Sequence, residues 1–241
     1  MPELSILMPV YNEHATVGEA IRQILDIDYP VEEVDLVIVD DGSTDGTREV
    51  LNGSSWGERV SVVMHERNGG KGVAVRTALE HATGTYSAIM DADLEYDPDD
   101  VAKVLEPLLT GEAEVVFGTR GFESHSAFSF WYVIGNKAVT LAANLLFNSW
   151  LSDIMTCHKA MRTDLLRSLE LTSSGFTIEP EITAKLLAAG YQVYEVPVRY
   201  NARGREEGKK LTALDGVRVL GTLLRCRAAA GRLPGRVRRH G

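Results

Sequence analysis

The sequence predicts a single α/β domain with a mostly parallel central sheet flanked by helices. Short apolar runs alternate along the chain with segments whose apolar residues recur at helical spacing. Several runs are too continuously apolar for strands that have one face in water, which is typical of a parallel sheet covered on both faces. The length of 241 residues and the hydrophobic content of 44% indicate one soluble globular domain.

Strands are expected where an apolar run ends in acidic or turn-forming residues. The expected strands are Leu4–Val10, Asp35–Asp41, Val60–Met64, Tyr86–Met90, Glu114–Gly118 and Val193–Tyr200. Pro197 lacks a backbone N–H group, so the last of these strands is expected at an edge of the sheet.

Helices are expected in most of the segments between these strands. They cover Ala15–Ile27, the residues around Arg48 and Leu51, Val73–Ala82, the segment up to Leu109, Ile178–Ala189 and Leu211–Ala230. Ser43 and Thr44 are expected to cap the second helix, and Asp97 with Pro98 the fourth. Gly190 is expected to end the fifth.

The segment from Ser126 to Leu151 is rich in aromatic and aliphatic residues and predicts a pair of amphipathic helices. Such helices belong either to the core or to a bilayer interface, and the pattern fits both. The longest nearly uninterrupted apolar stretch, Ala138–Phe147, is far shorter than the roughly 20 residues that a membrane-spanning helix needs. The chain is therefore not expected to cross a membrane.

The charges are distributed unevenly along the chain. The net charge is −9, yet no acidic residue follows Asp215. The residues after it include seven arginines: Arg218, Arg225, Arg227, Arg232, Arg236, Arg238 and Arg239. An acidic body argues against general nucleic-acid binding, whereas the basic tail favours contact with an anionic membrane surface. Two cysteines and the absence of a signal-peptide pattern favour a reducing cytoplasm.

The stretch Asp91-Ala92-Asp93-Leu94-Glu95 follows a buried strand directly. Three carboxylates at such a position repel one another unless a cation offsets their charge. Hard oxygen ligands of this kind suit Mg²⁺ or Mn²⁺. The alternative is a solvated acidic turn before the next helix, which accounts for Asp97 and Pro98 but not for Asp91 or Asp93.

Other polar residues also lie at the ends of expected strands, where open α/β sheets bind ligands. Tyr11, Asn12 and Glu13 follow the first strand, and Asp41, at the end of the second, can accept hydrogen bonds from a ribose or a base. The alternative for the first loop is an ordinary connection with Asn12 as a cap. Arg120 follows a strand and is suited to phosphate contact, or else is a surface residue.

Three further segments have weaker signals. The glycine-rich Asn68–Gly72 lacks the spacing of a phosphate-binding loop, although Lys71 can still lie near a diphosphate. Cys157 beside His158 lacks the spacing of a zinc site and predicts a buried thiol. Asp153 is a candidate catalytic carboxylate.

Taken together, these motifs resemble the family 2 glycosyltransferases, which have the GT-A fold. Within that family, the chain resembles the branch of dolichol-phosphate mannose synthase and the bacterial polyprenyl-phosphate sugar transferases. The resemblance rests on Pro9–Glu13, Val39–Thr47, Asn68–Gly72, Asp91–Glu95, Gly118–Arg120 and Glu195–Pro197, in this order and spacing.

The resemblance implies a site for a sugar-nucleotide donor. The residues implied to surround its nucleoside are Pro9, Tyr11, Glu13, Val39 and Asp41. Lys71 and Ala92 are also assigned to donor binding, and Asp91, Asp93 and Glu95 to the metal that bridges the diphosphate. Arg120, Arg203 and Lys209 are implied to hold phosphate.

Two departures from the mannose synthases concern the sugar. Those enzymes usually have glutamine where Glu95 stands, and their last loop reads Gly-Glu-Ser-Lys where this chain has Glu206-Glu207-Gly208-Lys209-Lys210. Mannose from GDP-mannose is the first expectation, and glucose from UDP-glucose the second.

The expected function is inverting transfer of a hexose from a nucleotide diphosphate sugar to a polyprenyl phosphate at the cytoplasmic face of the membrane. Asp93, Arg120 and Asp153 are the expected catalytic residues, in a catalytic domain of residues 1–211 followed by a basic amphipathic helix and tail of residues 212–241. One alternative is transfer to a hydroxyl of a soluble saccharide or small molecule. A second is a non-catalytic module that binds nucleotide sugars.

Overall fold

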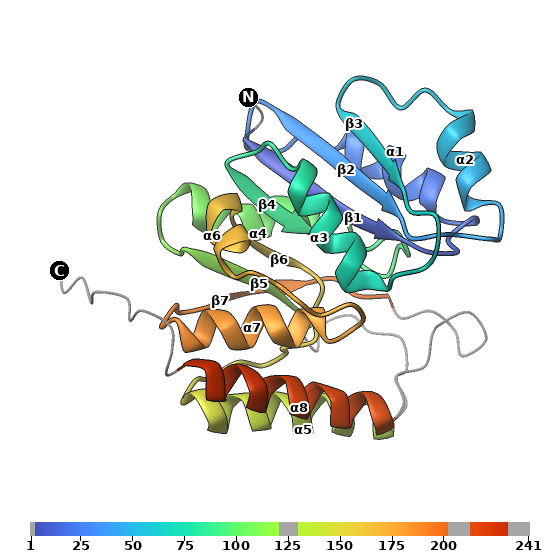
Figure 1. Cartoon of the computed structure of the whole chain (residues 1–241). Helices are drawn as coiled ribbons and strands as arrows, with labels where there is room; N and C mark the ends of the chain where they lie inside the picture. The colour runs from blue at the N-terminus through green and yellow to red at the C-terminus, as the bar shows by residue number, and fades with distance from the viewer. Residues whose placement is uncertain (1–2, 121–129, 202–212, 231–241) are drawn as a thin grey trace.

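The computed structural model describes residues 3–120, 130–201 and 213–230. In this part of the chain the strands form one sheet in the order β3-β2-β1-β4-β6-β5-β7 (Figure 1). The strands are β1 (Leu4–Val10), β2 (Val34–Asp40), β3 (Val60–Met64), β4 (Tyr86–Ile89), β5 (Val115–Arg120), β6 (Lys159–Arg162) and β7 (Tyr194–Val198). Neighbouring strands are parallel except around β6, which is antiparallel to β4 and β5. The predicted fold class is confirmed, and Pro197 lies on an edge strand as predicted.

The strand β6 is not predicted by the sequence, because it is only four residues long and begins and ends with a basic residue. Lys159 is nevertheless buried. Its ammonium donates hydrogen bonds to the carbonyls of Ile154 (3.1 Å) and Thr156 (2.6 Å) and lies 4.1 Å from the ring centroid of Phe117. Burial lowers the pKa of Lys159 to about 8. Backbone pairing with β4 and β5 thus makes a strand from residues without an apolar run.

Helices cover both faces of the sheet. Because successive side chains of a strand point to opposite faces, residues of the same strand pack against different helices. Leu4, Ile6 and Met8 of β1 pack with α1 (Val17–Asp26) and α4 (Asp100–Leu109). Leu7 of the same strand packs on the other side with α3 (Lys71–His81), α6 (Thr163–Ser168) and α7 (Ile178–Ala188). The short α2 (Thr47–Gly53) contacts α1 at the edge of the molecule (Figure 1).

A further helical layer lies outside α7 (Figure 1). It consists of α5 (Phe130–Phe147) and α8 (Ala213–Ala229), which share a small apolar core with Ala184 of α7. The predicted pair of helices between Ser126 and Leu151 is wrong for the described residues, because Phe130–Phe147 is one helix with no proline in it. The predicted domain boundary between residues 211 and 212 lies outside the described residues and stays a prediction.

The predicted cap of α2 is wrong. Helix α2 begins at Thr47, and Asp45, not Ser43 or Thr44, accepts the backbone N–H of its first residue at 3.0 Å. Helix α4 begins at Asp100, two residues after the predicted start at Pro98. The carboxylate of Asp97 nevertheless accepts the N–H of Asp99 at 3.0 Å, as expected of a cap, and backbone bonds continue from Asp97 into the helix. The predicted end of α7 at Gly190 is confirmed, with φ of +83° at that glycine.

Candidate functional site

The site lies where the strand order of the sheet reverses. From β1, the chain builds outward through β2 and β3 on one side, and then returns to place β4 on the other side of β1. The loops that follow β1 and β4 therefore leave the same edge of the sheet side by side. In open α/β sheets this reversal is where ligands bind. The predicted residues after Val10 and Ile89 lie on these two neighbouring loops.

The loops after β1 and β2 are linked by side-chain hydrogen bonds. The N–H of Asn12 donates to Oγ of Ser43, and the N–H of Thr44 donates to Oδ1 of Asn12, both at 2.9 Å. Asn12 adopts a left-handed conformation with φ of +56°. These bonds hold the turn in place, so that Tyr11 is 40% exposed beside it and the N–H of Glu13 donates to Oγ1 of Thr47. The positive φ is a local strain of the kind found at ligand sites.

Three of the residues expected around a nucleoside, Pro9, Val39 and Asp41, are buried in the protein. Pro9 and Val39 are partners in the register of β1 and β2, and the side chain of Val39 is fully buried in the core. Asp41 is also buried, and its carboxylate accepts the N–H groups of Gly69 (2.9 Å) and Gly70 (2.7 Å) and bonds Nδ1 of His65 (2.8 Å). A nucleoside contact with the side chain of Val39 therefore requires rearrangement, and Asp41 serves first to hold the glycine loop.

The glycine loop before α3 does not present its amides to a phosphate. Gly72 donates its N–H to the carbonyl of Ser174 at 2.8 Å. A Cβ atom on Gly72 would lie 2.3 Å from the carbonyl oxygen of Ser173, and one on Gly70 would lie 2.4 Å from that of Ser174. The glycines are needed because the loop before α7 passes this close. The prediction that this is no phosphate-binding loop is consistent with these bonds.

Lys71 joins this loop to the acidic stretch. Its ammonium lies 2.8 Å from both carboxylate oxygens of Asp91 and 2.6 Å from Oε1 of Glu179. Burial alone would lower the pKa of Lys71, but the two carboxylates outweigh it and raise the pKa well above its ordinary value. The sequence predicts a role for Lys71 and Asp91, but not for Glu179, which comes from the first turn of α7.

The other acidic residues of the stretch point to different partners. Asp93 accepts the N–H of Glu95 at 3.1 Å, and the carboxylate of Glu95 accepts the hydroxyl of Tyr200 at 2.5 Å. Leu94 between them has φ of +59°, and Ala92 is buried in the core. Among residues 3–120, 130–201 and 213–230, no three histidine, cysteine, aspartate or glutamate side chains are grouped closely enough to hold a metal ion. The predicted triad of Asp91, Asp93 and Glu95 thus does not converge here.

A divalent cation nevertheless fits the chemistry of this loop. Asp91 already receives a cation, the ammonium of Lys71, on both of its oxygens. Asp93 lies two residues further along the same loop and also supplies hard carboxylate oxygens of the type that Mg²⁺ and Mn²⁺ prefer. The assignment of Asp91, Asp93 and Glu95 as metal ligands stays a prediction.

Arg120 and Asp153, both predicted as catalytic, are bonded directly to each other. Nε of Arg120 lies 2.6 Å from Oδ2 of Asp153, and Nη2 lies 2.9 Å from Oδ1. The carboxylate also accepts Nδ2 of Asn136 (3.1 Å) and the N–H of Met155 (2.9 Å). Burial would raise the pKa of Asp153, but the guanidinium and these hydrogen bonds lower it below the usual value. The guanidinium also lies 5.2 Å from the ring centroid of Tyr200, which connects this pair to Glu95.

The segment around His158 is buried, although it contains several polar and charged residues. His158 stacks on Tyr96 at 4.5 Å between ring centroids, and burial lowers its pKa to about 4 although Asp100 and Asp91 oppose the shift. Cys157 is buried, as predicted, and burial raises the pKa of its thiol. Arg203 and Lys209 lie outside the described residues.

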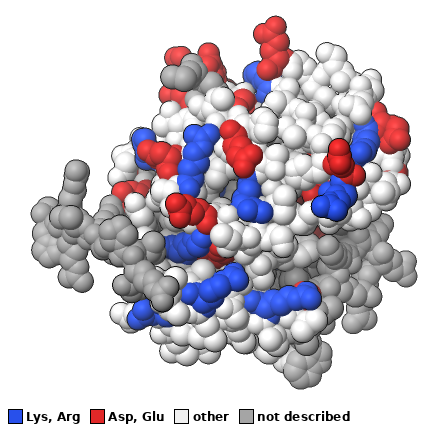
Figure 2. All heavy atoms as spheres, in the orientation of Figure 1, with Lys and Arg blue, Asp and Glu red and all other residues white. Residues whose placement is uncertain are grey.

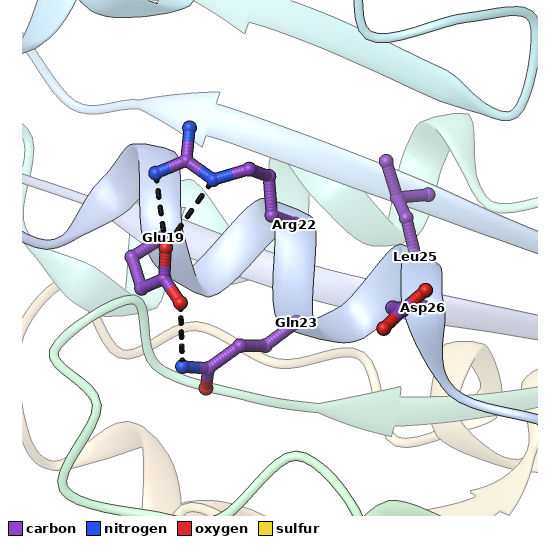
Figure 3. A pocket seen from close by; sticks show the side chains of 5 residues that line it. All are labelled: Glu19, Arg22, Gln23, Leu25 and Asp26. Carbon is purple, nitrogen blue, oxygen red and sulfur yellow. Dashed lines mark hydrogen bonds and ion pairs between the residues drawn. The ribbon is translucent and has the colours of Figure 1, made fainter.

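The pocket in Figure 3 is separate from this edge of the sheet. All five residues that line it belong to α1: Glu19, Arg22, Gln23, Leu25 and Asp26. Glu19 accepts hydrogen bonds from Arg22 and Gln23, so the charges there neutralise one another on an exposed helix surface. No second element contributes converging polar groups, and we assign it no ligand.

The chain is similar to known glycosyltransferases. The family model described as Glycosyl transferase family 2 matches residues 5–169. The chain is 31% identical over 199 residues to the glycosyltransferase AglJ of Haloferax volcanii, covering 82% of this chain and 63% of that protein. It is 26% identical to the low-salt glycan biosynthesis hexosyltransferase Agl6 of the same organism, covering 85% of this chain and 49% of that protein.

Solved structures share the fold. The structure of glucosyl-3-phosphoglycerate synthase from Mycobacterium tuberculosis superposes with a TM-score of 0.73 at 24% identity, over 94% of this chain and 81% of that one. Another structure of that synthase, with Mn²⁺, uridine diphosphate and glucosyl-3-phosphoglycerate, has a TM-score of 0.71. The family model covers more than half of the chain, and the fold is that of these transferases. The chain is therefore a member of glycosyltransferase family 2, with a GT-A fold.

Proposed function

We propose that this chain transfers a hexose from a nucleotide diphosphate sugar to a polyprenyl phosphate at a membrane surface. The choice of a phosphate acceptor rests on the ion pair between Arg120 and Asp153. Asp153 is bonded through both oxygens to a guanidinium and has a lowered pKa, so it is poorly suited to remove a proton from a hydroxyl. A phosphate acceptor is already ionised near neutral pH, since its second pKa is about 6 by analogy with phosphoserine.

The donor is proposed to bind along the loops that follow β1 and β4. Tyr11 offers an exposed ring beside the turn held by Asn12, and Glu13 lies next to it. Asp91 and Asp93 would hold Mg²⁺ or Mn²⁺, which would supply positive charge for the departing diphosphate. The solved neighbours that contain Mn²⁺ or Mg²⁺ with uridine diphosphate support a divalent cation.

Arg120 is proposed to add positive charge at the reacting phosphates. Its guanidinium has been positioned in advance by Asp153 and by the ring of Tyr200, and preorganised charge of this kind stabilises charge that develops in a transition state. Asp153 then orients Arg120 and, through it, the acceptor. Arg203 and Lys209, which the family resemblance assigns to phosphate binding, would be the other basic residues that contact the reacting phosphates.

The outer helical layer supports a membrane surface as the place of reaction. One face of α5 exposes Ile134 (45%), Leu141 (58%) and Leu145 (76%), and the outer face of α8 exposes Val217 (63%) and Leu224 (56%). Trp150, just after α5, is 92% exposed. Exposed apolar side chains gathered on adjacent helices are unusual for a surface that meets only water.

Positive charge accompanies this apolar surface. Helices α5 and α8 carry four basic residues, Lys137, Arg218, Arg225 and Arg227, and one acidic residue, Asp215. In Figure 2 the lower part of the molecule, where Figure 1 places these helices, is mostly uncharged, and the charged side chains visible there are mainly basic. An apolar face with a basic border fits an anionic lipid surface. No helix in the described ranges is long and apolar enough to span a bilayer.

The sugar is proposed to be a hexose, which agrees with the relative Agl6 being a hexosyltransferase. The family resemblance favours mannose from GDP-mannose. The solved complex of a neighbour with uridine-diphosphate-glucose favours UDP-glucose. The chain spans 63% and 49% of the length of the two Haloferax relatives.

A soluble acceptor is the second candidate. The observation that favours it is the likeness to glucosyl-3-phosphoglycerate synthase, one structure of which contains phosphoglyceric acid. Such an acceptor also bears a phosphate that Arg120 could hold, but it would be glycosylated on a hydroxyl and would need a base. The state of Asp153 argues against it.

The test is transfer of labelled sugar from GDP-mannose, UDP-glucose and UDP-N-acetylglucosamine, in parallel, with polyprenyl phosphate or 3-phosphoglycerate and either Mg²⁺ or Mn²⁺. We expect label from one donor in the organic phase, and its loss with Asp91→Ala or Asp93→Ala. Label only in the water-soluble product would overturn the lipid acceptor, and activity unchanged by a chelator would overturn the role of the metal.

A further inference from the structure

A buried carboxylate that the proposed reaction does not use lies behind the acidic loop. Glu179 is 4% exposed, and its Oε1 lies 2.6 Å from the ammonium of Lys71. Its second oxygen, Oε2, is buried without a hydrogen-bond partner among the described residues. A half-satisfied carboxylate in a buried position is costly, so its retention calls for a reason.

The three groups form one chain of charges. Asp91 at the end of β4, Lys71 at the start of α3 and Glu179 at the start of α7 are far apart in the sequence, and the ammonium lies between the two carboxylates. The loops around them are tied together, since Gly72 donates its N–H to Ser174 just before α7. The positions of the three side chains are thus set by backbone that is itself held rigidly.

Lys71 therefore occupies the carboxylate that a metal ion would need. Both oxygens of Asp91 face the ammonium at 2.8 Å, so a cation that binds Asp91 competes with Lys71 for the same carboxylate. A buried ammonium left without any carboxylate partner is strongly destabilised. Glu179 prevents this, because it already contacts Lys71 and has a second oxygen ready to accept a further hydrogen bond.

We propose that Glu179 is a positioning residue that holds Lys71 when Asp91 exchanges this ammonium for a divalent cation. The three residues act as an exchange device: Lys71 neutralises Asp91 in the absence of the cation, and Glu179 receives Lys71 in its presence. This inference rests on the metal site of the proposed function. It goes beyond that function by assigning Lys71 as an internal competitor of the cation and Glu179 as the group that lowers the cost of exchange.

The experiment measures Mn²⁺ binding to the full chain without donor or acceptor, from the electron paramagnetic resonance signal of free Mn²⁺. In Glu179→Gln, Lys71 keeps only Asp91 as an anionic partner, and we expect Mn²⁺ affinity to fall roughly 10-fold or more, in the range usual for coupled sites. The double variant Lys71→Met with Glu179→Gln removes one positive and one negative charge, so its net charge equals that of the wild type. The ammonium that competes with the cation for Asp91 is absent from it. We expect this double variant to bind Mn²⁺ several-fold more tightly than the wild type.

The matched control is Glu181→Gln on the same helix. Glu181 is also buried, but its carboxylate bonds Lys185, Thr172 and Ser173 and does not contact Lys71. We expect its Mn²⁺ affinity to equal that of the wild type. Thermal unfolding of every variant checks that the chain is folded at the temperature of the binding measurement.

The outcomes separate this inference from the proposed function. Wild-type affinity in Glu179→Gln, or a double variant that binds Mn²⁺ no better than the wild type, overturns the exchange device even if sugar transfer to lipid is observed. Absence of Mn²⁺ binding by the wild type overturns it as well. If the affinities follow the expected order but no lipid is labelled, the exchange device stands and the acceptor assignment fails.

Discussion

Arg120 and Asp153 are joined by two parallel hydrogen bonds of 2.6 and 2.9 Å, although 33 residues separate them in the sequence. A fork of this kind fixes the plane of the guanidinium as well as its position. It also holds Asp153 ionised, because the pKa of this carboxyl lies below its ordinary value. The pair therefore presents a fixed positive group at the end of β5 rather than a free base.

The first prediction concerns Asp153→Asn. An asparagine keeps one acceptor for Arg120 but removes the charge, so we expect the transfer rate to fall by less than about 10-fold, and the free energy of unfolding to fall by roughly 1–3 kcal/mol. A required general base would instead contribute about 10²- to 10⁴-fold. Steady-state kinetics with polyprenyl phosphate and chemical unfolding make the measurement.

The matched control for that variant is Asp164→Asn. Asp164 also forms a forked pair, with Arg162, but both side chains are exposed. We expect little change in rate or stability, since exposed ion pairs contribute little. A rate loss above 100-fold in Asp153→Asn with normal unfolding would show that Asp153 acts as a base.

The second prediction concerns the close approach of the two loops at the site. In Gly72→Ala the new Cβ would lie 2.3 Å from the carbonyl oxygen of Ser173, so backbone has to move. We expect a loss of about 1–3 kcal/mol in the free energy of unfolding. Gly135→Ala in α5 is the control, because a Cβ there meets no atom within 4 Å and alanine favours a helix. Equal stability of both variants would contradict the packing described.

The third prediction is that His158 makes the free energy of unfolding depend on pH in the acidic range. The pKa of His158 in the folded chain is about 4, against an ordinary value of 6.5, so the unfolded chain binds more protons between these values. Stability that is present above pH 6.5 is therefore lost as the pH falls towards 4, by up to roughly 3 kcal/mol. His158→Phe keeps the stacking on Tyr96 and removes this loss.

Urea unfolding of the wild type and His158→Phe at several values between pH 7 and pH 4 tests this. The difference in unfolding free energy between the two proteins should shift in favour of the variant as the pH falls. His81→Gln, at an exposed position on α3, should follow the wild type. Parallel curves for the wild type and His158→Phe would mean that His158 does not titrate as described.

The fourth prediction concerns the apolar face of α5. Leu141→Glu together with Leu145→Glu places two negative charges at positions that are 58% and 76% exposed, so folding should be retained. We expect the variant to lose flotation with vesicles that contain anionic lipid, because the apolar contact is lost and the charges are repelled.

Leu109→Glu, at the end of α4 on the opposite side of the sheet, is the control for vesicle binding. It should float as the wild type does. If the α5 variant also floats normally, this face does not dock on lipid. If the wild type fails to float while the double variant changes the oligomeric state, the face is a contact between copies of the chain.

Much of the fold could be predicted because its signals are local. A buried strand needs a run of apolar residues, and the loop after it needs polar or small ones, so the ends of β1, β2 and β4 could be located from the sequence together with Tyr11, Asp41 and Asp91. The strand β6 could not, because Lys159 is buried by its neighbours and carries no apolar signal. The predicted first residues of α2 and α4 are also wrong, because several polar residues before each helix can form the first turn.

The sequence by itself determined the α/β class, the family and the position of the acidic loop at a strand end. It determined these because strand periodicity, turn residues and ordered motifs are properties of short segments. Only the tertiary structure decided which charges meet: Lys71 with Asp91 and Glu179, Arg120 with Asp153. Such pairs join residues that the sheet and its helices bring together from distant parts of the chain, and Coulomb energy depends on that distance in space rather than on separation in sequence.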